Sequence, residues 1–200
     1  MKKDLLICGV GGQGILTISY LIDQTAFEAR LNFKQCEIHG MSQRGGAVSS
    51  HLRISSEPIL SNLVTKGQVD LIISMEPLET LRYLDYLSPQ GVVISNLAPF
   101  SNIPDYPDSH FLTAELNKWP RSVLLDAKAL AEQAGTQRAQ NTVMVGAATP
   151  FLELDAELIK KQIENLFATK DPKVIKANLQ AFELGLEVGR EAFVQFSGGA

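Results

Sequence analysis

The sequence contains few of the side chains that a metal or redox centre needs. Its 200 residues include only two cysteines and three histidines. A 4Fe–4S cluster needs four cysteine thiolates, and a structural zinc site needs four Cys or His ligands at characteristic spacings. We therefore expect this chain alone to hold no metal. Cys8 and Cys36 both lie in apolar, strand-like segments, where a reduced thiol acts as a small hydrophobic side chain.

Charge of one sign and long apolar runs are also scarce. Lys and Arg number 18 against 22 Asp and Glu, and no basic cluster stands out, so nucleic-acid binding is not predicted. No apolar stretch approaches the roughly 20 residues of a membrane-spanning helix. The apolar run that follows Lys3 is interrupted by Asp4 and ends at Gly9, which is too short for the core of a signal peptide. We expect a cytoplasmic protein without membrane contact.

Strand-like and helical patterns alternate over the first two thirds of the chain. A hydrophobic content of 45% over 200 residues is enough for one full core. We predict a single domain over residues 1–196 with a disordered tail at 197–200. The fold class is α/β, a three-layer Rossmann-like sandwich with a mainly parallel sheet and a helical C-terminal third. The predicted strands are Asp4–Cys8, Phe33–Ile38, Ala47–Ile54, Val69–Met75, Gly91–Ser95 (after a turn at 88–91) and Ser122–Asp126, and the predicted helices are Gln13–Arg30, Pro77–Leu87, Ala127–Ala134, Asn141–Ala148, Asp155–Phe167 and Asp171–Phe193.

Two further features predict contacts with another chain. Residues 98–110 contain three prolines and show no periodicity, which is typical of a binding loop, a contact surface or a plain connection. Gly185 and Gly189, four residues apart in the last predicted helix, form a smooth face that another backbone can approach closely. We expect a homo-oligomer in isolation and a hetero-oligomer in the cell.

The turn Gly9-Val10-Gly11-Gly12-Gln13-Gly14 follows a predicted strand and opens a predicted helix. This is the context that a dinucleotide-binding fingerprint requires, because glycines let the backbone approach a phosphate at the helix N-terminus. The alternative is a tight turn that binds nothing. An NAD site also needs a carboxylate at the end of the second strand; Glu37 is near that place but leads into a polar loop, so NAD(P) is not favoured. The residues predicted to bind a phosphate or another anion are Gly9, Gly11, Gly12, Gln13 and Gly14.

The most informative segment is His39-Gly40-Met41-Ser42-Gln43-Arg44-Gly45-Gly46-Ala47-Val48. The Arg44 guanidinium, flanked by Gly45 and Gly46, can bind a carboxylate or phosphate through two parallel hydrogen bonds. Ser42 and Gln43 can add neutral donors, and a histidine such as His39 titrates near neutral pH. The alternative is structural: Arg44 pairs with an acidic neighbour and His39 caps a strand. We predict that His39, Gln43 and Arg44 support catalysis and that Ser42, Arg44, Gly45 and Gly46 contribute to binding.

Two weaker motifs favour structural interpretations. Glu76 follows a buried strand and precedes Pro77, so we interpret it as an acidic residue at a helix N-terminus, although ligands of α/β proteins also bind at such strand ends. Asn141-Thr142 and Gly146 are interpreted as a helix start with a packing glycine.

The glycine turn and the His39–Val48 segment together closely resemble the gamma component of 2-oxoacid:ferredoxin oxidoreductases. Glu76-Pro77-Leu78-Glu79-Thr80-Leu81-Arg82-Tyr83-Leu84 and Tyr106-Pro107 look most like the beta subunit of the indolepyruvate enzyme. The resemblance extends to about Phe193. It implies a subunit of an enzyme that decarboxylates an aryl 2-oxoacid, reduces ferredoxin and releases an acyl-CoA.

The resemblance also implies that the cofactors are carried by a different subunit. A large partner subunit would carry thiamine diphosphate, Mg²⁺ and the 4Fe–4S clusters, and coenzyme A would be the co-substrate. This chain would bind no cofactor by itself and would show no activity alone. The glycine turn and the Arg44 loop would face the partner's active site or the coenzyme A path.

Other interpretations stay open on the sequence. The chain could serve a pyruvate, 2-oxoglutarate or branched-chain 2-oxoacid oxidoreductase instead. It could also be a free-standing Rossmann-like NAD(P)-binding oxidoreductase, or a nucleotide-binding assembly module. The sequence does not identify the 2-oxoacid, the oligomeric state or the surface that meets the partner.

Overall fold

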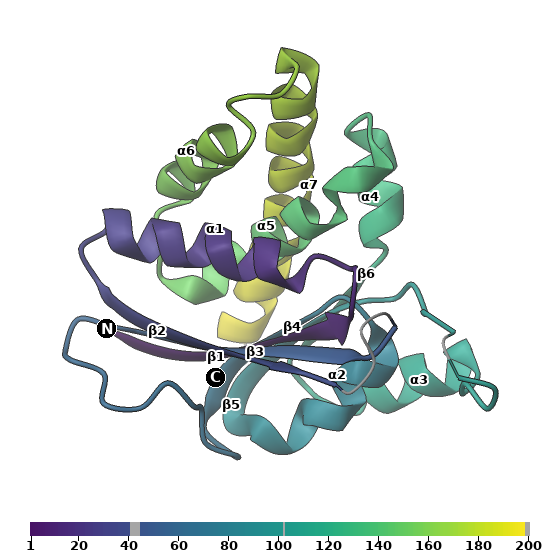
Figure 1. Cartoon of the computed structure of the whole chain (residues 1–200). Helices are drawn as coiled ribbons and strands as arrows, with labels where there is room; N and C mark the ends of the chain where they lie inside the picture. Colours follow the sequence, from purple (N-terminus) through teal and green to yellow (C-terminus); the bar gives the residue numbers. More distant parts are fainter. Residues whose placement is uncertain (41–44, 102, 199–200) are drawn as a thin grey trace.

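A six-stranded sheet forms the middle layer of the structure (Figure 1). The computed structural model describes residues 1–40, 45–101 and 103–198. Helices α1, α4, α5, α6 and α7 cover one face of the sheet, and α2 and α3 lie on the other. The predicted three-layer α/β sandwich with a helical C-terminal third is confirmed.

The observed helices and strands differ from the predicted segments by at most four residues at either end, and some, such as α2, are shorter than predicted. The strands are β1 Lys2–Val10, β2 Asn32–His39, β3 Ala47–Ser55, β4 Val69–Ser74, β5 Leu87–Asn96 and β6 Ser122–Leu125. The helices are α1 Ile15–Glu28, α2 Pro77–Tyr83, α3 Ser109–Leu116, α4 Ala127–Gln133, α5 Gln140–Leu152, α6 Ala156–Leu166 and α7 Pro172–Ser197, with 3₁₀ turns η1 Leu84–Tyr86 and η2 Gln137–Ala139.

The strand order is β2-β3-β1-β4-β5-β6. β1, β4, β5 and β6 pair in parallel, whereas β3 is antiparallel to both β1 and β2. β3 therefore separates β2 from β1, and a carboxylate at the end of β2 is one strand further from the glycine turn than in a dinucleotide-binding fold. Glu37 instead accepts a hydrogen bond from Gln35 Nε2 at 3.0 Å and pairs with His39 at 3.3 Å.

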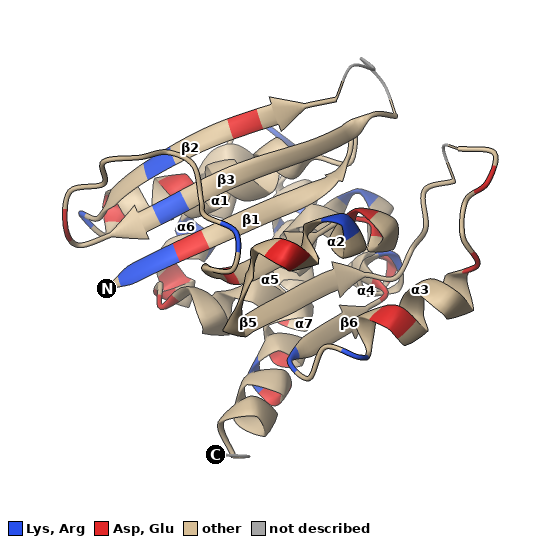
Figure 2. Cartoon of the chain, turned by 90° about the horizontal axis from the view of Figure 1, so that it is seen from below, with Lys and Arg blue, Asp and Glu red and all other residues tan. Residues whose placement is uncertain are grey.

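Apolar side chains fill both sides of the sheet. The larger cluster packs the upper face against α1, α5 and α7 and includes Leu5, Ile73 and Phe182, all fully buried. A smaller cluster around Leu6, Cys8 and Ile72 lies on the side of α2. Acidic and basic residues are interspersed where the sheet is seen from below (Figure 2).

Three local predictions were wrong. The predicted turn at 88–91 is part of β5, which begins at Leu87 and pairs irregularly with β4 between Val69 and Leu71. Helix α3 was missed, because it is short and buries only Leu112 and Leu116. Helix α5 continues past Pro150 to Leu152, since the last turn of that helix is held by burial.

Helices α5 and α7 pack with almost no space between their backbones. A Cβ atom at Gly185 would lie 2.0 Å from the carbonyl oxygen of Val143, and one at Gly189 would lie 2.3 Å from that of Ala147. Gly146 faces α7 in the same way, because a Cβ atom there would lie 2.2 Å from the carbonyl oxygen of Phe182. The smooth face predicted at Gly185 and Gly189 is therefore real, but α5 of the same chain covers it, and its assignment to a partner was wrong.

The ends of the chain differ slightly from prediction. Helix α7 runs to Ser197, the first residue of the tail predicted at 197–200. Residues 199 and 200 lie outside the described part of the chain. In the described residues, no helix is long and apolar enough to cross a membrane.

Candidate ligand site

An open cavity of about 520 Å³ lies at the carboxyl ends of β1, β4 and β5. This edge of a parallel sheet is where α/β proteins bind ligands. Segments from four parts of the chain meet there: the glycine turn, the ends of β4 and β5, and the start of α5. The lining residues are Gly12, Gln13, Gly14, Met75, Asn96, Ala98, Pro99, Phe100, Gln137, Arg138, Gln140 and Asn141.

Gln13 organises the glycine turn. Its Oε1 accepts a hydrogen bond from Val10 N at 2.7 Å, and its Nε2 donates to Met75 O at 3.4 Å. A Cβ atom at Gly9 would lie 2.8 Å from Gln13 Oε1, so this position has no room for a side chain. Gln13 thus joins β1 to the end of β4 and sets the shape of the cavity floor.

Gly14 and Asn141 meet at the start of α1. Gly14 has a left-handed conformation with φ 76°, and its carbonyl oxygen accepts a hydrogen bond of 3.0 Å from Asn141 Nδ2. The N-cap residue of α1, Gly14, has no side chain to cap the helix, whereas α2, α3, α4, α6 and α7 each begin at an acidic residue that accepts a backbone N–H. The uncapped N–H groups and the helix dipole favour an anion at this end of α1.

The predicted glycine-turn residues therefore separate into two groups. Gly12, Gln13 and Gly14 line the cavity. Gly9 is packed beneath Ile15 and Gln13, and Gly11 donates its N–H to Gly46 O at 2.9 Å. This last bond joins the base of the second predicted loop to the glycine turn.

The second predicted loop is described only at its two ends. His39 is the last residue of β2, its ring is half exposed, and its Nε2 lies 3.3 Å from Glu37 Oε2. Gly40 donates to Ala47 O at 2.8 Å, and Gly45 has φ 73°. Ser42, Gln43 and Arg44 lie outside the described residues.

Glu76 caps α2, as interpreted from the sequence, and also anchors a distant loop. Its Oε2 accepts the N–H of Glu79 at 2.8 Å. Its Oε1 accepts the N–H of Phe100 at 3.2 Å and the hydroxyl of Tyr106. The Glu76 side chain is almost completely buried, so the segment that contains Phe100 is attached to the end of β4.

The sequence analysis did not identify Asn96, the cavity role of Asn141 or the contact between Tyr106 and Glu76. Asn96 is buried, donates to Met75 O at 3.3 Å and accepts from Ala127 N at 3.1 Å. Its position directly at the end of a buried strand is a signal that would have found it. Asn141 and Tyr106 carry no such signal, because their partners are distant in the chain.

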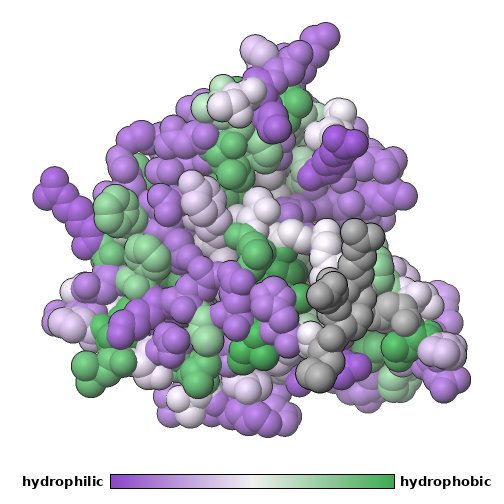
Figure 3. Space-filling view, viewed as in Figure 1, coloured by the Kyte–Doolittle hydropathy of each residue, from purple (hydrophilic) through white to green (hydrophobic). Residues whose placement is uncertain are grey.

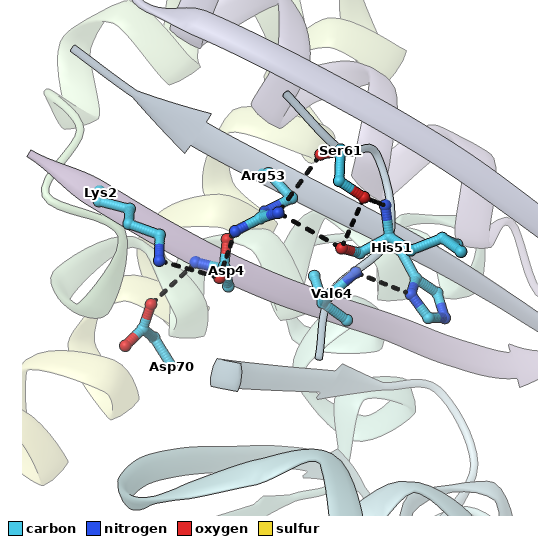
Figure 4. A network of polar contacts seen from close by, with 8 residues as sticks. Lys2, Asp4, His51, Arg53, Ser61, Val64 and Asp70 are labelled. Carbon is cyan, nitrogen blue, oxygen red and sulfur yellow. Dashed lines mark hydrogen bonds and ion pairs between the residues drawn. The ribbon is translucent and has the colours of Figure 1, made fainter. Parts of the chain in front are cut away.

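A second polar network lies at the opposite end of the sheet (Figure 4). The buried Asp4 carboxylate accepts bonds of 2.7 and 3.0 Å from Arg53 Nε and Nη2, and Arg53 Nη1 donates to the carbonyl oxygens of Ser61 and Leu63 at 3.4 Å. The Asp4–Arg53 pair joins β1 to β3, and the two bonds from Arg53 Nη1 tie the strand-free segment at 56–68 to β3, which indicates a structural role.

Two acidic side chains are buried with one oxygen unpaired. Asp23 Oδ1 and Glu79 Oε2 have no hydrogen-bond partner among the described residues. Burial, with a smaller contribution from Glu37, raises the pKa of Asp23 to about 7. Burial also raises the pKa of Glu79, although the nearby Arg82 opposes the shift. Asp23 belongs to α1 and is not among the residues that line the cavity.

Comparison with known proteins assigns the chain to a family. Residues 4–188 match the pyruvate ferredoxin/flavodoxin oxidoreductase family. Indolepyruvate oxidoreductase subunit IorB of Thermococcus kodakarensis is 37% identical over 96% of this chain and 98% of its own length.

Solved structures share the fold. Pyruvate oxidoreductase subunit PORC of Thermotoga maritima has a TM-score of 0.72 and 23% identity, over 93% of this chain and 96% of its own. A 2-oxoglutarate:ferredoxin oxidoreductase of Magnetococcus marinus, solved with 2-oxoglutarate, coenzyme A and succinyl-CoA, has a TM-score of 0.76 and 18% identity, over 95% of this chain and 31% of its own. The match over nearly the whole chain, together with the close relative IorB, shows that this protein belongs to the pyruvate ferredoxin/flavodoxin oxidoreductase family.

Proposed function

We propose that this chain is the small, non-redox subunit of a thiamine diphosphate-dependent indolepyruvate (arylpyruvate):ferredoxin oxidoreductase. The observation that carries the proposal is the 37% identity to an indolepyruvate oxidoreductase subunit over almost the full length of both chains. The reaction is the oxidative decarboxylation of the 2-oxoacid to an acyl-CoA, with ferredoxin as electron acceptor.

The described residues of this chain show no ligand set for the metal cofactors of the enzyme. In the described part of the chain, no three His, Cys, Asp or Glu side chains group as metal ligands. Cys8 is fully buried, and burial raises the pKa of its thiol, so it stays protonated and is a poor ligand. In the proposed complex, the large partner subunit carries thiamine diphosphate, Mg²⁺ and the 4Fe–4S clusters.

The cavity suits the anionic co-substrate, coenzyme A. The N-terminus of α1, which begins at a glycine, and Arg138 favour phosphate groups. Gln13 and Asn141 hold the turn that leads into α1. The loop that contains Arg44 ends beside this turn, because Gly46 O accepts a hydrogen bond from Gly11 N. This supports roles for His39, Ser42, Gln43 and Arg44 at the junction with the partner's active site.

The outer face of α1 is a suitable surface for the partner. Its exposed positions include Leu16, Tyr20 and Phe27. The two charged residues of α1 are Asp23, which is buried, and Glu28 at its last position. A helix that is apolar on its outer face as well is typically covered in an assembly. Figure 3 views the molecule from this side and shows hydrophobic residues at the surface between hydrophilic ones.

Co-expression with a large thiamine diphosphate-binding subunit from the same organism tests the proposal. The purified complex should reduce ferredoxin with indolepyruvate in a reaction that requires coenzyme A. Pyruvate, 2-oxoglutarate and 2-oxoisovalerate serve as competing substrates, and each subunit alone serves as a control. NAD-linked turnover by this chain alone, or a preference of the complex for a non-aryl 2-oxoacid, would contradict the proposal.

A further inference from the structure

One buried carboxylate fixes a loop that forms part of the cavity wall. Glu76 Oε1 accepts hydrogen bonds from both the Phe100 N–H and the Tyr106 hydroxyl. Both ends of the segment between these two residues are therefore attached to a single atom. That atom belongs to a side chain that is only 1% exposed and that also caps α2.

The anchor itself is held firmly in the sheet. Glu76 directly follows Met75, whose carbonyl oxygen accepts hydrogen bonds from Gln13 Nε2 at 3.4 Å and from Asn96 Nδ2 at 3.3 Å. The floor of the cavity and the loop wall are thus parts of one hydrogen-bonded unit. A displacement of the loop would require the rupture of bonds to a buried carboxylate, which is costly.

This unit fixes an aromatic ring at the cavity. Phe100 is a lining residue and is 41% exposed. Its ring contributes nothing to the two buried clusters of the core. The loop thus holds a phenyl ring in place without burying it, and rings fixed in this way in a concave site typically contact a ligand.

We propose that Phe100 is a stacking wall for a planar aromatic ring of an anionic ligand, and that Tyr106 and Glu76 are the positioning residues that hold this wall in place. The inference rests on the proposed function. The ligand's anionic part lies toward the uncapped N-terminus of α1 and Arg138, which line the same cavity. Two molecules of the reaction have this chemistry: coenzyme A, through adenine, and indolepyruvate, through indole.

The segments that join here are the two that look most like the indolepyruvate enzyme. Glu76 opens the segment 76–84, and Tyr106 belongs to the Tyr106-Pro107 pair. Their hydrogen bond links these two segments at the wall of the cavity. The hydrogen bond therefore couples the start of α2 to the loop that carries Phe100.

The test is a steady-state analysis of the reconstituted complex with Phe100→Ala and Phe100→Leu. Loss of a ring that stacks on a ligand should raise the KM of that ligand about tenfold, with kcat little changed. A rise confined to coenzyme A assigns the wall to adenine, and a rise confined to indolepyruvate assigns it to indole. Phe111→Ala is the matched control, because Phe111 is 54% exposed on the following helix and does not line the cavity.

A double-mutant cycle tests the positioning role. Tyr106→Phe keeps the ring but loses the hydroxyl bond, and should raise the same KM about threefold, the effect of roughly one lost hydrogen bond of moderate strength. In the Phe100→Ala background, Tyr106→Phe should no longer raise this KM. A purely structural role of Tyr106 would not produce this result.

Unchanged KM values in both Phe100 variants, equal rises for both ligands, or the same rise in Phe111→Ala would overturn the inference. A wild-type complex without coenzyme A-dependent indolepyruvate oxidation would instead refute the proposed function.

Discussion

The contact between Gly14 and Asn141 allows a quantitative prediction for Gly14→Ala. Gly14 has φ 76°, and an alanine in the left-handed region costs about 1–2 kcal/mol. The new Cβ would lie 1.9 Å from Asn141 Nδ2. Asn141 must move, and the loss of its 3.0 Å bond to Gly14 O costs roughly 0.5–1.5 kcal/mol. We expect the free energy of unfolding to fall by about 1.5–3.5 kcal/mol, the sum of these two estimates.

Gly67→Ala is the matched control, and urea unfolding followed by circular dichroism is the assay. Gly67 has φ 74°, but no atom lies within 4 Å of a Cβ placed there. Gly67→Ala should therefore lower the free energy of unfolding only by the cost of a left-handed alanine, about 1–2 kcal/mol. In an Asn141→Ala background, the cost of Gly14→Ala should fall to that of Gly67→Ala. Equal losses for Gly14→Ala and Gly67→Ala in the wild-type background would refute the reasoning.

Three further predictions concern packing, pH and the second loop. Gly185→Ala should prevent folding or cost at least about 3 kcal/mol, because its Cβ would lie 2.0 Å from Val143 O on a backbone that cannot yield; a soluble variant with an unchanged melting temperature would contradict the close packing of α5 and α7. The pKa of Asp23 is raised to about 7 by burial, so its contribution to stability is intact below about pH 4 and is lost as the pH rises through 7. Asp23→Asn should therefore be more stable than the wild type at pH 8, by about 1–3 kcal/mol, and this advantage should vanish toward pH 4 in urea titrations; an advantage independent of pH would refute it. Arg44→Ala should lower kcat/KM of the reconstituted complex by the equivalent of about 2–4 kcal/mol, and Arg44→Lys should restore little because the bidentate fork is lost; wild-type activity of Arg44→Ala would show that the loop is structural.

The order of helices and strands follows from the sequence because local periodicity determines it. Apolar runs such as Val69–Ser74 and the capped start of α7 at Asp171 can be recognised without tertiary information. The position of β3 in the sheet cannot be recognised in this way. Its insertion between β1 and β2 depends on pairing between strands that are distant in the chain. The same limit explains why the turn at 88–91 was predicted where β5 continues.

The candidate site was predictable only in part. The glycine turn has a sequence pattern with a physical meaning, and it lies at the cavity. Asn141 is 127 residues away from Gly14 in the chain, and Tyr106 is 30 residues away from Glu76. No periodicity or spacing connects such pairs. Glu76 is an example. Its role at the N-terminus of α2 could be predicted from the sequence, whereas its hydrogen bonds to the loop that contains Phe100 and Tyr106 could not.

The most direct test of the account is ferredoxin reduction by the large subunit with and without this chain. With indolepyruvate and coenzyme A supplied, the complex should turn over, and the large subunit alone should be inactive or strongly impaired. This chain alone should be colourless and inactive with every 2-oxoacid. Full activity of the large subunit without this chain, or 2-oxoacid oxidation by this chain alone, would contradict the central claim that it is a required, non-redox subunit.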